Sequence, residues 1–225
     1  MKRFSIILFV ILILAPTVEG KNKTTYNSVI EIIVPNKNDL FKSKILHFCK
    51  ENRINTNDLF AWQAHWVLYA HFNHIENTKL KLEKVFPSVR IKLYKTPFYI
   101  FDRKQFIKTD IAKEWDNVIM TADLVKDTAM QHQYIEYHKT QFQKWPEIAQ
   151  GFCNADFQQL LVFHNGRQLM LIISIPKGKT LNELNPLTVK NNPKMDQWNA
   201  IMSKYQVGIP DAPAGTTWVL FHHVK

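Results

Sequence analysis

A tyrosine and a histidine four residues apart, Tyr134 and His138, form the pair whose spacing most clearly suggests chemistry. On a helix, residues i and i+4 are surface neighbours, so the phenol and the imidazole would share one face. Phe142, Trp145 and either Ile148 or Ala149 continue that face at steps of three and four, which sets the pair in an aromatic, apolar stripe. Histidine exchanges its proton near neutral pH, so a buried pair of this kind beside a cavity can move protons.

The same spacing is compatible with a purely structural role. Tyrosines and histidines on amphipathic helices are commonly core or rim residues whose polar tips each find a hydrogen bond. The two interpretations differ in one structural feature, which is whether a cavity lies beside the two rings.

Short motifs on both sides of this pair form an ordered series along the second half of the chain. They are an apolar strand at 117–124, the Tyr134–His138 pair, Trp145-Pro146-Glu147, two strands at 160–163 and 168–175, Trp198-Asn199 in a second helix, and an aromatic strand at 218–221. By this series, the segment from about Trp115 to the C-terminus resembles the L-rhamnose mutarotase family. The resemblance implies a cofactor-independent enzyme that interconverts the α and β anomers of a reducing sugar, L-rhamnose or a related deoxy sugar.

The resemblance also implies roles for individual residues. His138 would be the chief acid and base, and Tyr134 would bind the sugar or relay a proton. Trp198 would form a wall of the sugar site, with Asn199 holding a hydroxyl. Trp145 would be a wall or a core residue, and we favour the core. No cofactor and no metal ion is implied.

The chain departs from the family pattern in three places. The gap between His138 and Trp145 is longer than usual by about one helical turn, roughly 3.6 residues. Asn199 stands where family members often have a second tryptophan. A strand tyrosine that contacts sugar in the family falls at Phe157-Gln158, which we take as the remaining substrate-binding candidates. The proton chemistry therefore carries over more directly than the sugar specificity.

Three other functions fit the same residues. The first is a non-catalytic, exported sugar-binding module on the same fold. The second is a different enzyme on that fold, such as a cofactor-free monooxygenase. The third is an exported pair of domains with a structural role.

The two halves of the chain show the same order of expected elements. In the first half they are a strand at 28–34, a helix at 38–53, a β-rich segment at 59–73, a helix at 75–86 and strands at 89–94 and 98–101. In the second half they are a strand at 116–124, a helix at 127–144, a short helix after Pro146, strands at 158–164 and 168–175, a helix at 193–206 and a strand at 217–223. Each half approximates the β-α-β-β-α-β order of the ferredoxin-like fold.

We therefore predict an α+β fold of two tandem ferredoxin-like domains of the dimeric α+β barrel type. The first domain, a degenerate copy, covers 26–102, a linker covers 103–114, and the mutarotase-like domain covers 115–225. An antiparallel sheet with helices on one face leaves its other face bare, and a bare apolar face needs a partner. We expect the two antiparallel sheets to pack face to face, in a monomer with an internal pseudo-dimer or in a homodimer.

The N-terminus has the pattern of a secretory signal peptide. Lys2 and Arg3 precede an apolar run at 4–15, and Gly20 is a small residue suited to cleavage. The run is too short for a comfortable membrane span. We predict removal of residues 1–20, a periplasmic or secreted protein, and no membrane partner for the mature chain.

Charge and cysteine content add two expectations. The chain has 29 Lys and Arg against 19 Asp and Glu, a net charge of +10, but the basic residues are scattered and no nucleic-acid-binding motif is present. We therefore expect a small-molecule sugar as partner, and no nucleic acid. Cys49 and Cys153 lie in apolar surroundings, where a small buried hydrophobe is the usual role, and their separation in sequence does not decide whether they pair, so we do not predict a disulfide.

Overall fold

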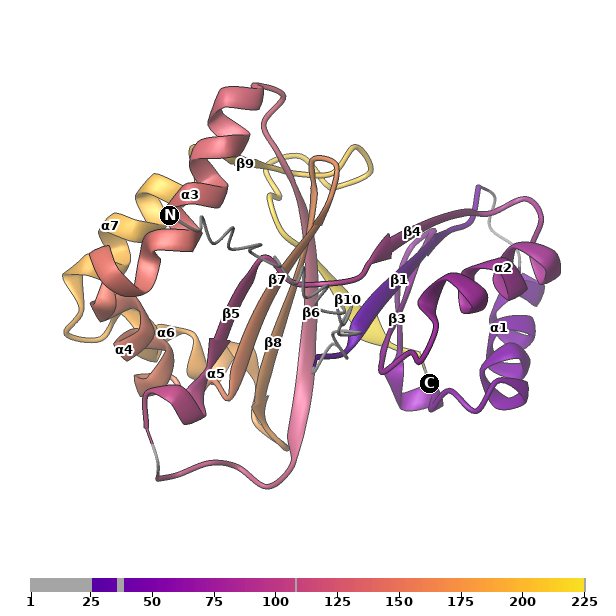
Figure 1. Cartoon of the computed structure of the whole chain (residues 1–225), viewed down its shortest axis with the longest axis horizontal. Helices are drawn as coiled ribbons and strands as arrows, with labels where there is room; N and C mark the ends of the chain where they lie inside the picture. The colour runs from indigo at the N-terminus through magenta and orange to yellow at the C-terminus, as the bar shows by residue number, and fades with distance from the viewer. Residues whose placement is uncertain (1–25, 36–38, 108, 225) are drawn as a thin grey trace, which may run out of the picture.

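Both halves of the chain form a ferredoxin-like unit in the computed structural model, which describes residues 26–35, 39–107 and 109–224 (Figure 1). The first unit comprises β1 (Ser28–Ile33), α1 (Asp39–Glu51), β2 (Leu59–Trp62), β3 (His65–Ala70), α2 (Ile75–Val85) and β4 (Arg90–Tyr94). Its antiparallel strands are ordered β4-β1-β3-β2. The signal peptide predicted for residues 1–20 lies outside the described residues.

The second unit repeats this topology. It comprises β6 (Trp115–Leu124), α3 (Thr128–Lys144), α4 (Pro146–Asn154), β7 (Gln159–Asn165), β8 (Gln168–Pro176), α7 (Pro193–Met202) and β10 (Val219–His223). The strand order β10-β6-β8-β7 is the same permutation as in the first unit. Two short helices, α5 (Leu181–Leu184) and α6 (Pro186–Val189), precede α7. The α+β class and the ferredoxin-like units predicted from the sequence are therefore confirmed.

Local sequence explains the element ends that frame the later site. The side chain of Asp127 accepts a hydrogen bond from Met130 N (3.0 Å) and so caps the start of α3. Pro146 opens α4 at its first turn, where a missing N–H costs nothing. Gly166, at φ +58°, forms the two-residue turn between β7 and β8.

The two sheets are joined through β10 and enclose a shared core. β10 pairs with β6 over Val219–Phe221 and with β2 at His222 and His223, which makes one continuous ten-stranded sheet. The core between the sheets contains residues of both halves: Val29, Phe60, Val67, Tyr69 and Tyr94, with Ile119, Leu161, Phe163, Met170, Ile172 and Phe221. Helices α1 and α2 lie on one outer side of the molecule and α3, α4 and α7 on the other (Figure 1). Each half thus covers the apolar sheet face of the other.

A buried carboxylate also links the two sheets. Glu31 of β1 accepts hydrogen bonds from Tyr94 Oη (2.9 Å) and, across the interface, from Gln168 Nε2 of β8 (3.1 Å). It also bonds His65 Nδ1 (2.7 Å), whose Nε2 lies 3.2 Å from Asp211. Burial alone would raise the pKa of Glu31, but the His65 hydrogen bond and nearby positive charge hold it below its usual value. Buried polar groups satisfied in this way favour one specific docking of the two halves.

The strand at 99–102 lies in a different sheet from the one expected. β5 (Tyr99–Asp102) follows the first unit, but it pairs with β7 of the second, with Tyr99 opposite Val162 and Phe101 opposite Leu160. β4 already completes the first sheet, whereas β7 would otherwise be an open edge with unpaired backbone groups. The sequence predicted a first domain over residues 26–102. The last strand of that range, β5, belongs to the second sheet instead.

The helix expected at 193–206 is shorter in the structure. α7 ends at Met202, and residues 206–207 form β9, which pairs with β6 through Leu124 and Gln206. Through this pairing the chain returns to the sheet directly after α7. This turn places Gln206 beside the helix α3.

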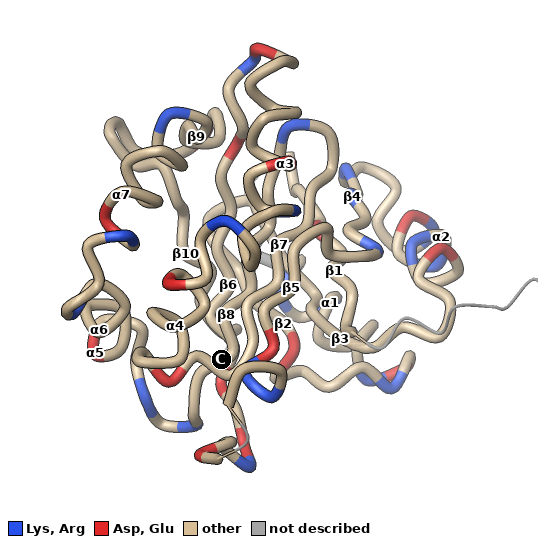
Figure 2. The backbone as a smooth tube through the Cα atoms, turned by 60° about the vertical axis from the view of Figure 1, so that its left-hand side comes forward, with Lys and Arg blue, Asp and Glu red and all other residues tan. Residues whose placement is uncertain are grey.

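The two cysteines are buried and free, as the sequence suggested. Cys49 belongs to α1 and packs in the core of the first half, and Cys153 belongs to α4 and packs in the core of the second half. Basic and acidic residues are interspersed along the helices and loops in Figure 2 rather than gathered in one place. Among the described residues, no helix has the length and apolarity needed to cross a membrane.

Expressed alone, residues 115–225 are expected to form dimers or aggregates rather than a compact monomer. Removal of the first half would expose the apolar side chains of Ile119, Phe163 and Met170 to water. Light scattering after gel filtration would measure the state. A segment of residues 98–225 is the matched control, because it restores β5 but not the missing sheet. A soluble, compact, active monomer from 115–225 would show that the first half is not needed to cover the sheet.

Candidate active site

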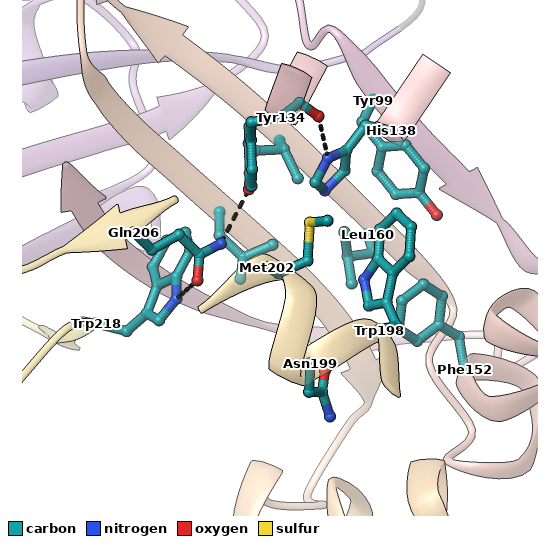
Figure 3. Close-up of a pocket in the computed structure, with 12 residues that line it drawn as sticks. Tyr99, Tyr134, His138, Phe152, Leu160, Trp198, Asn199, Met202, Gln206 and Trp218 are labelled. Atoms are coloured by element: carbon teal, nitrogen blue, oxygen red, sulfur yellow. Dashed lines mark hydrogen bonds between the residues drawn. The ribbon is translucent and has the colours of Figure 1, made fainter. Parts of the chain in front are cut away.

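A cavity of about 260 Å³ lies between the second sheet and helices α3 and α7 (Figure 3). This volume lies just below the roughly 300–1,000 Å³ of typical small-molecule sites, which suits a small ligand. Its lining is aromatic and apolar with a few polar groups: Tyr99, Tyr134, His138, Phe152, Leu160, Val162, Leu171, Trp198, Asn199, Met202, Gln206 and Trp218. Of the described residues, none that lines it is a lysine, arginine, aspartate or glutamate.

Helix α3 presents Tyr134 and His138 on one buried face, as their spacing predicts. Their ring centroids lie 4.3 Å apart, and both side chains border the cavity. A cavity therefore lies beside the two rings, and this is the feature that favours a reactive site over a packed core.

The hydrogen bond at His138 fixes its tautomer. Nδ1 lies 3.0 Å from the backbone carbonyl oxygen of Tyr134, and this oxygen can only accept, so Nδ1 bears the proton. Nε2 then has the free lone pair, and it has no hydrogen-bond partner among the described residues. Burial lowers the pKa of His138 to about 4, although the bond to the carbonyl opposes this shift. The imidazole is therefore neutral at neutral pH, with a basic nitrogen at the cavity.

Tyr134 belongs to a short hydrogen-bonded chain shown by dashed lines in Figure 3. Its hydroxyl oxygen lies 3.1 Å from Gln206 Nε2, and Gln206 Oε1 lies 3.1 Å from Trp218 Nε1. Burial raises the pKa of Tyr134 well above its usual value. The phenol is thus held protonated, and its oxygen accepts the hydrogen bond from Gln206.

Aromatic rings form the walls. Trp198 of α7 meets His138 edge-on at 5.3 Å between centroids, and Trp145 packs against Trp198 at 5.9 Å. Tyr99 of β5 also meets His138 edge-on, at 5.1 Å, but its hydroxyl donates to Gln141 Oε1 (2.9 Å). Tyr99 therefore contributes its ring to the cavity rather than its hydroxyl.

The structure brings together four of the six residues proposed from the sequence. Tyr134, His138 and Trp198 border the cavity from two helices, and Asn199 lies exposed at its rim. Trp145 does not line the cavity but supports Trp198 from behind. Trp145 is half-buried and packs against the core of the second half from outside, whereas we favoured a place in the core itself.

Phe157 and Gln158 do not line the cavity, which corrects their assignment as substrate-binding residues. Phe157 is 1% exposed and stacks on Phe152 in the core at 5.9 Å. The Gln158 amide is bonded at both ends, from Nε2 to Asp156 O (2.8 Å) and from Ala112 N to Oε1 (3.0 Å). Both residues precede β7, and their side chains are buried in the core rather than at the cavity.

Several lining residues were not foreseen as site residues. Trp218 belongs to the aromatic strand motif that helped define the resemblance, so its type was a usable signal. No sequence motif marks three of the others, Tyr99, Phe152 and Gln206. Contacts between distant segments of the chain bring their elements, β5, α4 and β9, to the cavity.

A neutral imidazole and a protonated phenol border this aromatic cavity, an arrangement that can transfer a proton. Residues 117–224 match the model of the L-rhamnose mutarotase family. The match confirms the resemblance inferred from the motifs and places it in the C-terminal half. It includes α3, α7 and Trp218, but not β5 with Tyr99. No curated protein matches the chain.

Two solved structures from Listeria monocytogenes are similar to this chain in fold. One is a haem-degrading enzyme, with 13% identity, a TM-score of 0.41, and coverage of 88% of this chain and 99% of the other. The second is an uncharacterised ferredoxin-fold protein related to antibiotic biosynthesis monooxygenases, with 12% identity, a TM-score of 0.40, and coverage of 89% and 97%. At these TM-scores the likeness carries no conclusion about this chain.

Proposed function

We propose that the protein is a sugar mutarotase that exchanges the α and β anomers of a neutral reducing sugar, L-rhamnose or a related deoxy sugar. One observation is the main support. The free Nε2 of His138 and the hydroxyl of Tyr134 border the same small cavity with aromatic walls. The family match of residues 117–224 adds the reaction class.

The reaction needs one proton to leave the anomeric hydroxyl and one to reach the ring oxygen. His138 Nε2 accepts the anomeric proton while the bond between C1 and the ring oxygen breaks. The electrons of that bond go to the ring oxygen, and a carbonyl forms at C1. The Tyr134 hydroxyl donates a hydrogen bond to the ring oxygen. The His138 imidazolium then transfers the proton that it took from the anomeric hydroxyl to this ring oxygen. Rotation of the carbonyl and reversal of these steps give the other anomer.

The pKa of each group fits its part in this sequence. The lowered pKa of His138 keeps it available as a base at neutral pH and makes its imidazolium ready to give the proton back. The raised pKa of Tyr134 suits hydrogen-bond donation without transfer of its own proton. A single histidine therefore moves the proton, while the tyrosine stabilises the ring oxygen.

The lining favours an uncharged sugar with an apolar end. Phe152, Leu160 and Leu171 give a surface suited to a methyl group, and Trp198 can pack against sugar C–H bonds. No charged side chain of the described lining is available to pair with a carboxylate or phosphate. We therefore expect neutral deoxy sugars to bind better than uronic acids or sugar phosphates.

A panel of sugars tests the proposal. Nuclear magnetic resonance (NMR) exchange spectroscopy would measure anomer exchange with L-rhamnose, other neutral deoxy sugars, fully hydroxylated hexoses and a uronic acid. Exchange of neutral deoxy sugars with little effect on the uronic acid is the expected pattern. Binding without faster exchange would favour the sugar-binding module, and neither binding nor exchange would leave the structural role.

Replacement of Trp198 by alanine is expected to weaken sugar binding more than it slows the chemical step. A wall residue contributes contact in both ground and transition states, so its loss raises KM while kcat changes little. We expect Kd to rise roughly tenfold, about 1.4 kcal/mol. Titration calorimetry with the sugar checks this, and Trp62→Ala, in the first half of the chain, is the matched control. A large loss of kcat with unchanged Kd would contradict the wall role.

We also propose that the protein acts outside the cytoplasm, after removal of residues 1–20. The support is the basic start and apolar run of the sequence. Mass spectrometry of the native protein should find a chain that begins near Lys21. An intact Met1–Gly20 segment on soluble cytoplasmic protein would overturn the proposal.

A further inference from the structure

We propose that Gln206 is a positioning residue, which orients the Tyr134 hydroxyl so that its proton points into the cavity. The inference deepens the proposed function and rests on it for its kinetic test. It concerns a residue of β9 that the motif series does not contain. The geometry that supports it is the chain from Trp218 through Gln206 to Tyr134 in Figure 3.

The indole of Trp218 fixes the orientation of the Gln206 amide. A glutamine side chain has one accepting oxygen and one donating NH2 group, and the two ends are easily exchanged. The indole Nε1–H is a donor only, so the amide atom that it contacts at 3.1 Å must be the oxygen. The NH2 group is then the end that faces Tyr134.

The amide in turn fixes the Tyr134 hydroxyl. Gln206 Nε2 donates to the phenolic oxygen at 3.1 Å, so that oxygen acts as acceptor in this bond. The hydroxyl proton must point elsewhere, and no described residue accepts it. Because Tyr134 lines the cavity, the remaining direction is toward the space that a ligand would fill. The phenol is thereby set as a donor before a sugar arrives.

The backbone holds Gln206 in place for this role. β9 pairs with β6 through Gln206 and Leu124, and Val125 N donates to Tyr205 O at 2.8 Å beside it. Trp218 directly precedes β10, which also pairs with β6. The strand β6 therefore anchors both Gln206 and the segment that begins at Trp218.

Replacement of Gln206 by glutamate tests the direction of the bond with almost no change of shape. The introduced carboxylate can still accept the hydrogen bond from the Trp218 indole. Toward Tyr134, however, it cannot donate a hydrogen bond as the amide does, and can only accept one from the phenol. It would draw the phenolic proton away from the cavity. When protonated at low pH, the same group can donate to the phenol and restore the original direction.

The expected result is a loss of kcat that depends on pH. At pH 8 the Gln206→Glu variant should show kcat at least tenfold below that of the unchanged protein, and the loss should shrink as the pH falls toward 5. Gln206→Ala should lose less kcat than Gln206→Glu at pH 8 and show no such recovery, because its phenol is free to rotate. Equal losses of kcat at pH 8 and pH 5 in the folded Gln206→Glu variant would overturn the proposal.

A spectroscopic measurement keeps the proposal testable if the protein does not exchange anomers. Tyrosine labelled with ¹³C at Cζ reports the hydrogen-bond state of the phenol, and Tyr134→Phe identifies the signal. In Gln206→Glu this signal should shift with pH between 5 and 8, whereas in the unchanged protein it should not. A shift without anomer exchange would refute the proposed function and support the positioning role. An identical, pH-independent signal in both proteins would refute the positioning role.

A second variant covers the case in which Gln206→Glu does not fold. Trp218→Phe removes the indole donor and leaves the amide free to present either end to Tyr134. We expect a partial loss of kcat, roughly twofold to tenfold, with KM little changed. Unchanged kcat in this folded variant would overturn the proposal, because the indole would then not fix the amide.

Discussion

Replacement of His138 by alanine is expected to slow anomer exchange by about two to four orders of magnitude, the usual contribution of a positioned acid–base group. Its Nε2 is the only basic nitrogen on the described lining of the cavity, because the nitrogens of Trp198, Trp218, Asn199 and Gln206 are not basic. Tyr134→Phe should reduce the rate less, since it removes a hydrogen bond rather than the proton carrier.

The control for this experiment lies on the same helix. His132 of α3 is exposed and does not line the cavity, so His132→Ala should retain the full rate. Circular dichroism would show whether each variant is folded. If folded His138→Ala exchanges anomers as fast as the unchanged protein, the cavity is a binding site and not a catalytic one.

The protein is also expected to lose stability between pH 6.5 and 4, with about 3 kcal/mol of the loss due to His138. Its pKa is lowered to about 4 in the folded state, against an ordinary value of 6.5. Between these values the unfolded chain binds a proton that the folded protein does not. Unfolding therefore becomes easier as the pH falls through this interval, and the effect is complete below about pH 4.

Urea unfolding of the unchanged protein and of His138→Gln at pH 6.5 and 4.5 measures this contribution. The variant should lose distinctly less free energy of unfolding over the interval, because glutamine does not titrate. His65 and Glu31 act outside the measured interval of pH 6.5 to 4.5. The raised pKa of His65 gives stability that is present below pH 6.5 and lost at higher pH, and the lowered pKa of Glu31 gives stability lost only at lower pH. If both proteins lose the same free energy of unfolding between pH 6.5 and 4.5, His138 is not buried in its neutral form.

Local sequence patterns were sufficient for the parts of the molecule that depend on local geometry. The i, i+4 relation of Tyr134 and His138 holds wherever a helix forms, so their shared face could be predicted. The β-α-β-β-α-β order of both halves followed from alternating apolar runs and turn residues such as Asn165-Gly166. The role of Trp198 in the wall came from the family resemblance.

The parts that could not be predicted depend on contacts between distant segments. Tyr99 reaches the cavity because β5 pairs with β7, some sixty residues away in the chain. Gln206 reaches it because β9 pairs with β6 and ends α7 early, although the local sequence suggested a longer helix. Phe157 and Gln158 were assigned by position in a family pattern, which does not fix the direction of a side chain.

The central claim is that His138 of this chain exchanges sugar anomers, and one measurement tests it most directly. Magnetisation transfer between the anomeric proton signals of α- and β-L-rhamnose gives the exchange rate, with and without the protein. We predict a rate that rises in proportion to the concentration of the unchanged protein and stays near the spontaneous value with an equal amount of folded His138→Ala. A spontaneous rate at every concentration of the unchanged protein, with L-rhamnose and with the related deoxy sugars, would contradict it.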